Sequence, residues 1–255
     1  MIIVAVDVET TSLDAEDGEI VEMGAVLFDT ETCRVISVFG KVYKVNKWGE
    51  EAAECHQIPQ EMSNMMPLIE DDDIDPWDAI SGDLAEFVVA HNAGHDHAFV
   101  TKIWPKFLNK PWLCTQRDLN HTDIINSVTS KRLAHLCVDY HISMGSWHQA
   151  VADAEACARI AAKHDLNEAY KRKLEPKYRF IAYGGFIENF SDLAKQAPSA
   201  LKDGRGYRWN DDNAPKAWSK ENLTLDEVEL DAKYLKEITK GKWKFEGTPM
   251  PPKPY

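Results

Sequence analysis

The hydrophobic pattern at the start of the chain is a short apolar run followed by two acidic side chains. Residues 1–6 are apolar and rich in Ile and Val, and Asp7 and Glu9 stand on either side of Val8. An apolar run of this length is typical of a strand buried on both faces. Because side chains alternate along a strand, Asp7 and Glu9 should point to the same side. The pattern predicts two neighbouring carboxylates at the end of a buried strand.

Two further apolar stretches, 19–28 and 33–43, flank the turn-like segment 29–32, and this pattern predicts an antiparallel meander with the first strand. Short strands are expected at 87–90 and 112–114. Helices are expected at 78–87, 96–107, 116–126, 131–138 and 149–164, with short helices between 52 and 66, an acidic loop at 70–76 and a turn at 91–94. Strands that alternate with helices after an antiparallel start predict an α/β fold with a mixed sheet.

Charge is distributed unevenly along the 255 residues. Residues 1–165 hold 12 Lys/Arg and 28 Asp/Glu, a net charge of −16, whereas residues 166–255 hold 17 and 14, a net charge of +3. This shift predicts an α/β domain over 1–165 and a small basic and aromatic module over 166–255. The acidic domain repels nucleic acid. A polyanionic substrate would therefore need metal ions, backbone donors or a local basic patch.

The second module interleaves basic and aromatic residues, for example at 205–209 and 242–245. Such a mixture suits contact with nucleic acid through phosphate pairing and base stacking. The alternative is a small domain with an aromatic core and solvated Lys and Arg side chains. Residues 246–255 contain four prolines and predict an extended tail.

No stretch of the sequence resembles an export signal or a run of 18 apolar residues, so we expect a cytoplasmic protein outside the membrane. The five cysteines are widely spaced and form no C-x-x-C pair, as in a protein with reduced, mostly buried thiols. They are Cys33, Cys55, Cys114, Cys137 and Cys157.

The helix predicted at 149–164 carries a carboxylate on its inward face. At 100° per residue, one face holds Ala150, Asp153, Ala154, Cys157, Ile160 and Ala161. An inward Asp153 needs a partner, because an unpaired buried charge costs several kcal/mol. The partner could be a helix cap or an arginine, or a cation shared with Asp7 and Glu9. Crowded carboxylates either take up a proton or share a cation, and their oxygens suit Mg²⁺ or Mn²⁺.

Two other residues are candidates for the same site. His148 falls in the loop before this helix, from which an imidazole could exchange protons with water; a plain surface histidine is the alternative. Asp96 begins the predicted helix 96–107, as a fourth carboxylate or as a cap. His91, His95 and His97 admit a zinc hydrolase, although residues 92–94 look like a turn and further ligands are not evident.

Three motifs occur in order along roughly residues 1–165. They are residues 7–11, residues 91–96 and residues 148–154, the last with His-x4-Asp spacing. Two shorter elements, His56-Gln57-Ile58 and Cys114-Thr115, accompany them. This set resembles the DEDDh family of 3′–5′ exonucleases, which includes polymerase proofreading subunits. The resemblance implies an RNase H-like fold, with a mixed five-stranded sheet flanked by helices, to which the small C-terminal module is added.

The resemblance also implies a mechanism with two divalent ions, Mg²⁺ or Mn²⁺. Asp7, Glu9 and Asp153 would hold one ion, Asp7 would bridge to the second with Asp96 assisting, and His148 would be the general base. The implied reaction releases nucleoside monophosphates from the 3′ end of DNA, with RNA as a possible substrate, in repair or proofreading beside a polymerase. A non-catalytic binding protein on the same fold is the alternative.

Contacts with the terminal nucleotide are expected from Thr10, Leu13 and Asn92. The sequence departs from the family pattern at two nearby positions, where Ser12 replaces a common glycine and His95 replaces a common aromatic residue. Neither departure removes a proposed metal ligand. Both concern the pocket for the terminal nucleotide, and they leave the choice between DNA and RNA open.

Overall fold

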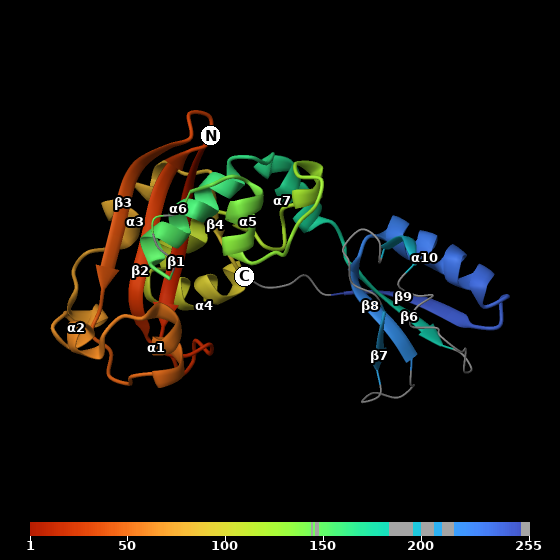
Figure 1. The fold of residues 1–255 in the computed structure, drawn as a ribbon, viewed down its shortest axis with the longest axis horizontal. Coiled ribbons are helices and arrows are strands. Elements are labelled where there is room, and N and C mark those ends of the chain that lie inside the picture. The colour runs from red at the N-terminus through yellow and green to blue at the C-terminus, as the bar shows by residue number, and fades with distance from the viewer. Residues whose placement is uncertain (144, 146–147, 184–195, 200–206, 211–216, 251–255) are drawn as a thin grey trace. The chain divides into compact units, whose positions relative to one another are not determined.

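A computed structural model describes residues 1–143, 145, 148–183, 196–199, 207–210 and 217–250. The chain forms two compact units, residues 1–173 and 174–254 (Figure 1). The charge shift placed a boundary after residue 165. The first unit continues to Lys173, because helix α7 (Leu166–Leu174) packs Leu166 and Ala169 into its core.

The first unit is built on a five-stranded sheet. Its strands are β1 (Ile2–Thr10), β2 (Ile20–Asp29), β3 (Arg34–Val42), β4 (Phe87–Ala90) and β5 (Trp112–Cys114), in the order β3-β2-β1-β4-β5. The pairs β1–β2 and β2–β3 are antiparallel, whereas β4 runs parallel to β1 and β5 parallel to β4. The predicted meander and the mixed sheet are confirmed.

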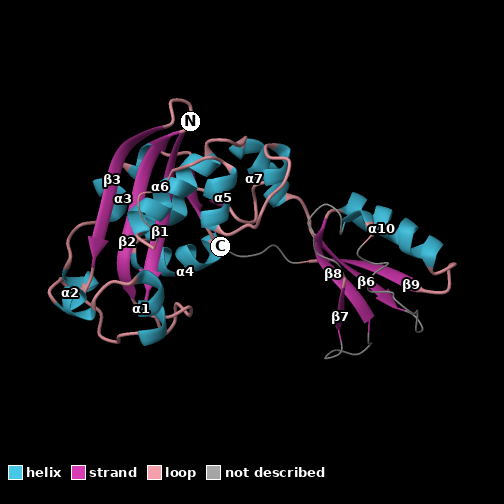
Figure 2. Cartoon of the chain, viewed as in Figure 1, coloured by secondary structure: helices cyan, strands magenta, loops and turns pink. Residues whose placement is uncertain are grey.

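Helices lie on the faces of this sheet and at one end of it, as the colouring by secondary structure in Figure 2 shows. Besides α7 they are α1 (Glu50–His56), α2 (Gln60–Asn64), α3 (Pro76–Ala79), α4 (Ala93–Ile103), α5 (Leu133–Asp139) and α6 (Ala150–Ala161). The 3-10 turns among the described residues are η1 (Ile69–Asp71), η2 (Gly82–Leu84), η3 (Pro105–Asn109) and η4 (His121–Asp123). Within the part of the chain that the structure describes, no helix is both long and apolar enough to cross a bilayer.

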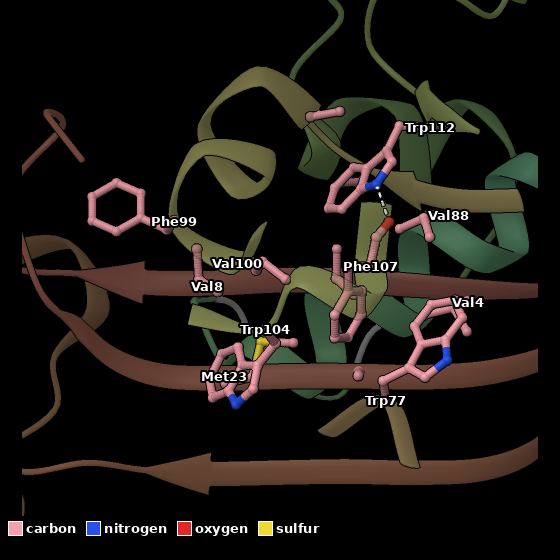
Figure 3. Packing of buried hydrophobic residues seen from close by; sticks show 14 of the residues in the cluster. Val4, Val8, Met23, Trp77, Val88, Phe99, Val100, Trp104, Phe107 and Trp112 are labelled. Atoms are coloured by element: carbon pink, nitrogen blue, oxygen red, sulfur yellow. Dashed lines mark hydrogen bonds between the residues drawn. The ribbon is translucent and has the colours of Figure 1, made fainter. Parts of the chain in front are cut away.

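One hydrophobic core lies on the face of the sheet that α4 covers. The even-numbered side chains of β1, Val4, Val6 and Val8, belong to it. Figure 3 shows this core, in which the Trp112 indole donates a 2.9 Å hydrogen bond to the carbonyl of Phe107. Since successive strand residues face opposite sides, the odd-numbered residues of β1 face the other layer.

The second core lies between the sheet and α6. Ile3 and Ala5 of β1 pack there against a helix with many small residues. Asp7 and Glu9 continue this odd-numbered row toward the end of the strand. The carboxylates therefore leave the sheet on the α6 side.

The predicted helix 78–87 is wrong. Helix α3 ends at Ala79, and Ser81 adopts a left-handed backbone conformation with φ 61°. The turn allows Gly82 to lie against the Trp77 ring, where an added Cβ would come within 2.4 Å of Trp77 Cδ2. Close packing of an aromatic ring thus overrides the helical pattern.

The predicted helix 116–126 is also wrong, because polar side chains bind the backbone there. Asp118 accepts a 2.7 Å hydrogen bond from the Cys114 amide. The His121 ring lies between the Thr115 carbonyl and the Tyr140 hydroxyl, each at 2.8 Å. Such side-chain contacts compete with helix formation, and only the turn η4 forms.

The five cysteines have free thiols, as predicted. Cys114, Cys137 and Cys157 are buried, whereas Cys33 and Cys55 are exposed.

In its described residues, the second unit contains a four-stranded antiparallel sheet and a long helix. The strands are β6 (Tyr178–Tyr183), β7 (Arg208–Asn210), β8 (Ala217–Leu223) and β9 (Lys244–Pro249), in the order β7-β8-β6-β9, and the helix is α10 (Leu225–Ile238). A capping box between Thr224 and Glu227 starts α10.

The core of this unit contains Phe180, Tyr207 and Trp243, which favours the alternative of a small domain with an aromatic core. The extended tail predicted at 246–255 is wrong over 246–249, because these residues pair with β6 as part of β9. Residues 251–255 lie outside the described part of the chain.

Candidate active site

At the site, strand β1 extends beyond the neighbouring strand β4. The parallel pairing with β4 joins Ile3–Ala5 to Phe87–Val89, and β4 ends at Ala90. Past that point the Val8 amide donates to Asp96 Oδ1 at 3.2 Å. Asp96 is 2% exposed. This hydrogen bond therefore holds the Asp96 carboxylate beside the backbone of Val8, the residue between Asp7 and Glu9.

Helix α4, which carries Asp96, starts earlier than predicted. The helix begins at Ala93, so the turn predicted at 91–94 is wrong beyond residue 92. Asn92 makes the turn with φ 66°, and its carbonyl accepts a hydrogen bond from the His95 amide, which closes the first helical turn. Asp96 lies within that turn and binds Val8; it is not the N-cap.

Helix α6 carries Asp153 to the site, and the face of the helix that is buried is the one that the sequence predicted. Every residue of the predicted stripe is buried: Ala150, Asp153, Ala154, Cys157, Ile160 and Ala161. The first turn of α6 lies directly on β2, where Gly24 is the register partner of Asp7. A Cβ at Gly24 would come within 2.3 Å of the Ala150 carbonyl carbon.

Gly24→Ala should therefore displace the start of α6. Overpacking of this kind costs about 1–3 kcal/mol, and moving Asp153 should also lower nuclease activity. Urea unfolding and a nuclease assay measure the two effects. Gly145→Ala is the stability control, since a Cβ there meets no atom within 4 Å. Equal stability of the two variants would contradict the close contact.

Glu9, His148 and Asp153 converge. Each offers one ligand atom, and these atoms lie within 4.8 Å of one another. His148 is exposed and has φ 55° in the loop before α6, as the sequence predicted for its place. Asp153 Oδ1 is buried and has no hydrogen-bond partner among the described residues. Three converging ligand groups, one of which also has a buried oxygen without a partner, fit a divalent cation.

Burial and mutual repulsion raise the pKa of each carboxyl. Burial raises the pKa of Asp7 well above its ordinary value, with further increases from Asp96, Glu9 and Asp153. Burial raises the pKa of Glu9 to about 7 and that of Asp96 to about 8. For Asp153 burial raises the pKa to about 6, against a lowering by His148. Near neutral pH these four carboxyl groups together retain protons, and a bound cation would displace them.

These pKa values predict how an Asp96→Asn variant responds to pH in the presence of a chelator. The raised pKa of Asp96 means that the folded protein binds this proton more tightly than the unfolded chain does. As pH rises from about 4 to 8, the free energy of unfolding of the wild type should lose the contribution of this bound proton, whereas asparagine does not titrate. The variant should gain stability relative to the wild type until about pH 8.

Urea unfolding at pH 5, 7 and 9 measures this difference. The control is Asp29→Asn, because hydrogen bonds from Thr32 and Glu31 lower the pKa of Asp29, so its titration lies below this range. A constant stability difference between Asp96→Asn and the wild type would refute the prediction.

Sequence reasoning missed Glu22. This residue on β2 is the register partner of Glu9, so it shares the α6 side of the sheet. Its Oε2 accepts a 3.1 Å hydrogen bond from the Ala150 amide. Burial raises the pKa of Glu22, and the Ala150 bond lowers it. The register of the predicted hairpin could have placed this fifth carboxylate.

The residues expected to contact the terminal nucleotide lie around this end of the sheet. Thr10 is buried, and its hydroxyl donates to the Ser12 carbonyl at 2.8 Å and lies 3.4 Å from His95 Nε2. Leu13 is 91% exposed on the loop after β1, and Asn92 is exposed. An apolar side chain this exposed is available to a ligand.

The three histidines behind the zinc alternative do not converge in the described part of the chain. His91 contacts the Thr115 hydroxyl at 2.9 Å. The ring of His97 packs edge-on against Trp112, and His95 lies near Thr10. The described geometry therefore disfavours the zinc hydrolase.

A family model described as Exonuclease, RNase T type, matches residues 4–161. The chain belongs to this exonuclease family. Its mixed five-stranded sheet with flanking helices is the RNase H-like fold that the sequence predicted. A search of curated proteins finds no match.

Solved structures share the fold at low identity. Escherichia coli Exonuclease I in complex with a dA16 oligonucleotide has a TM-score of 0.57 and 12% identity, covering 92% of this chain and 67% of that one. The nuclease domain of 3′hExo, a DEDDh family member bound to rAMP, has a TM-score of 0.50 and 14% identity, covering 64% of this chain and 90% of that one. A second Exonuclease I structure gives 0.53 and 12%, covering 98% and 64%.

Proposed function

We propose that this exonuclease removes nucleoside monophosphates from the 3′ end of DNA, with RNA as the alternative substrate, and that it uses two bound Mg²⁺ or Mn²⁺ ions. The observation that carries the proposal is the convergence of Glu9, His148 and Asp153, and Asp153 also has a buried oxygen without a hydrogen-bond partner among the described residues. Buried acids that repel one another are stable together when cations neutralise them.

The carboxylates of Asp7, Glu9 and Asp153 would hold one ion, and those of Asp7 and Asp96 the second. When bound, the ions supply the Lewis acidity that activates water and stabilises charge on the phosphate and on the leaving oxygen. The hydrogen bond from the Val8 amide anchors Asp96 and holds its carboxylate in a fixed position next to the residues that flank Val8, Asp7 and Glu9.

His148 is the proposed general base. Its ring lies beside Glu9 and Asp153, and the loop before α6 leaves it open to solvent. One ring nitrogen would take the proton of the attacking water as the new phosphorus–oxygen bond forms. Solvent exposure would let the ring return that proton before the next cycle.

Substrate contact is proposed for Thr10, Leu13 and Asn92, which lie around this end of the sheet. For the second unit we propose nucleic-acid binding or the docking of a polymerase in replication or repair. Arg208 and Lys244 are exposed on strands of its sheet, which supports phosphate contact. The free buried thiols fit work in the reducing cytoplasm.

The test is digestion of 5′-labelled DNA and RNA, single and double stranded, with Mg²⁺, with Mn²⁺ and with chelator. The expected result is a ladder of labelled products that shorten from the 3′ end, and no digestion in chelator. Immediate release of the 5′-labelled nucleotide, or full activity in chelator, would refute the proposal.

A further inference from the structure

The start of helix α6 is held by a strand rather than by its own cap. Gln149 is the N-cap residue, and its side chain makes no capping hydrogen bond. The Ala150 amide instead donates to Glu22 Oε2 at 3.1 Å, across 128 positions of the chain. An acidic side chain at a helix N-terminus also interacts favourably with the helix dipole.

Two glycines bring this helix end close to the sheet. Gly24 on β2 faces the Ala150 backbone, and Gly40 on β3 faces Val151, where an added Cβ would lie 2.5 Å from Val151 Cγ2. Close approach to Gly24 and Gly40 sets the height of the helix above the sheet. The hydrogen bond of Glu22 then fixes its position along β2.

This anchoring point lies between two site residues. Ala150 follows His148 by two residues and precedes Asp153 by less than one helical turn. The same anchor therefore constrains both the imidazole loop and the carboxylate. Glu22 itself is the register partner of Glu9, the third member of the converging group.

Helix stability alone does not require a carboxylate here. A Ser, Thr, Asp or Asn side chain at position 149 would cap the same helix locally. Glu22 adds a fifth acid beside Glu9 in a partly buried site, where like charges repel. A local cap would not fix the helix relative to the sheet. The long-range bond does so, because it ties the helix that carries Asp153 to β2, the strand that pairs with Glu9.

We propose that Glu22 is a positioning residue of the nuclease site, which holds Asp153 and His148 in register with Glu9. This inference rests on the proposed two-ion function. Glu22 acts through its bond to Ala150 and is not assigned contact with substrate.

The experiment compares Glu22→Ala, Glu22→Gln and Asp75→Ala in the full chain, with kcat and KM on 5′-labelled single-stranded DNA. Glu22→Ala should lower kcat by roughly 10- to 100-fold, the cost of a misplaced site, while KM changes little. Glu22→Gln should restore most of kcat, because its amide oxygen can accept the same bond. Asp75 accepts the Trp77 amide at the start of α3, so Asp75→Ala should lower the melting temperature and leave kcat unchanged.

Binding of Mn²⁺, followed by electron paramagnetic resonance, gives a readout separate from turnover. Glu22→Ala should weaken Mn²⁺ binding by severalfold relative to Glu22→Gln. If the wild type binds Mn²⁺ but digests no nucleic acid, the proposed function fails while this comparison still tests the role of Glu22. If Glu22→Ala does not fold, Glu22→Asp replaces it, since the shorter side chain keeps the charge and loses the reach.

Two results would overturn the positioning role. One is a folded Glu22→Ala or Glu22→Asp protein with the kcat and Mn²⁺ affinity of the wild type. The other is a Glu22→Gln protein whose kcat falls as far as that of Glu22→Ala, since the hydrogen-bond acceptor would then be irrelevant.

Discussion

Asp7→Asn is expected to lower kcat by roughly 10³-fold, corresponding to about 4 kcal/mol of lost transition-state stabilisation. Asp7 interacts electrostatically with Asp96, Glu9 and Asp153, and it is the carboxylate proposed to help hold both ions. In chelator the same variant should melt at a higher temperature than the wild type. Burial and the charges of Asp96, Glu9 and Asp153 all disfavour an ionised Asp7, and a neutral amide removes that penalty.

Opposite changes in activity and stability distinguish a functional carboxylate from a structural one. The measurements are kcat with Mg²⁺ and the melting temperature with chelator and with Mg²⁺. Asp29→Asn on β2 is the matched control, and it should leave kcat unchanged. A fully active Asp7→Asn enzyme would eliminate the two-ion proposal.

His148→Asn should lower kcat by roughly 10²- to 10³-fold, the usual contribution of a general base. Asparagine suits the position because it tolerates the left-handed backbone of His148 better than alanine does. Binding of Mn²⁺ and of DNA should persist, since the carboxylates remain. The measurements are single-turnover rates across pH and equilibrium binding of labelled DNA.

The matched control for this variant is His141→Asn. His141 is also exposed and also left-handed, with φ 57°, but it is not in the converging group. The His141 variant should digest DNA at the wild-type rate. An unchanged rate in His148→Asn would exclude His148 as the base.

The sequence predicted β1, the meander and the inward position of Asp153 because their patterns are local. Alternation along residues 1–10 fixes a strand, and helical periodicity fixes which face of α6 is buried. The turns around Gly82 and His121 depend on contacts with Trp77 and Tyr140, which local pattern does not contain. Local helical spacing therefore failed at 78–87 and 116–126.

The residues of the candidate site also divide into those that local pattern predicts and those that depend on contacts between distant segments. Asp7, Glu9 and Asp153 could be named from strand alternation and helix phase. Asp96 was named as a fourth carboxylate or as a cap, but its bond to Val8 depends on β4 ending before β1 does. Glu22 became visible only with the register of β1 against β2, since nothing in its own neighbourhood singles it out.

The packing of α7 sets the smallest piece of this protein that should work alone. A chain cut after residue 165 would leave the surface beneath Leu166 and Ala169 open to water, and would lose the 2.6 Å hydrogen bond from Lys173 to the Trp112 carbonyl on β5. A chain cut just beyond residue 174 keeps both. Shortened versions meant to isolate the nuclease should end there, and the shorter cut should aggregate.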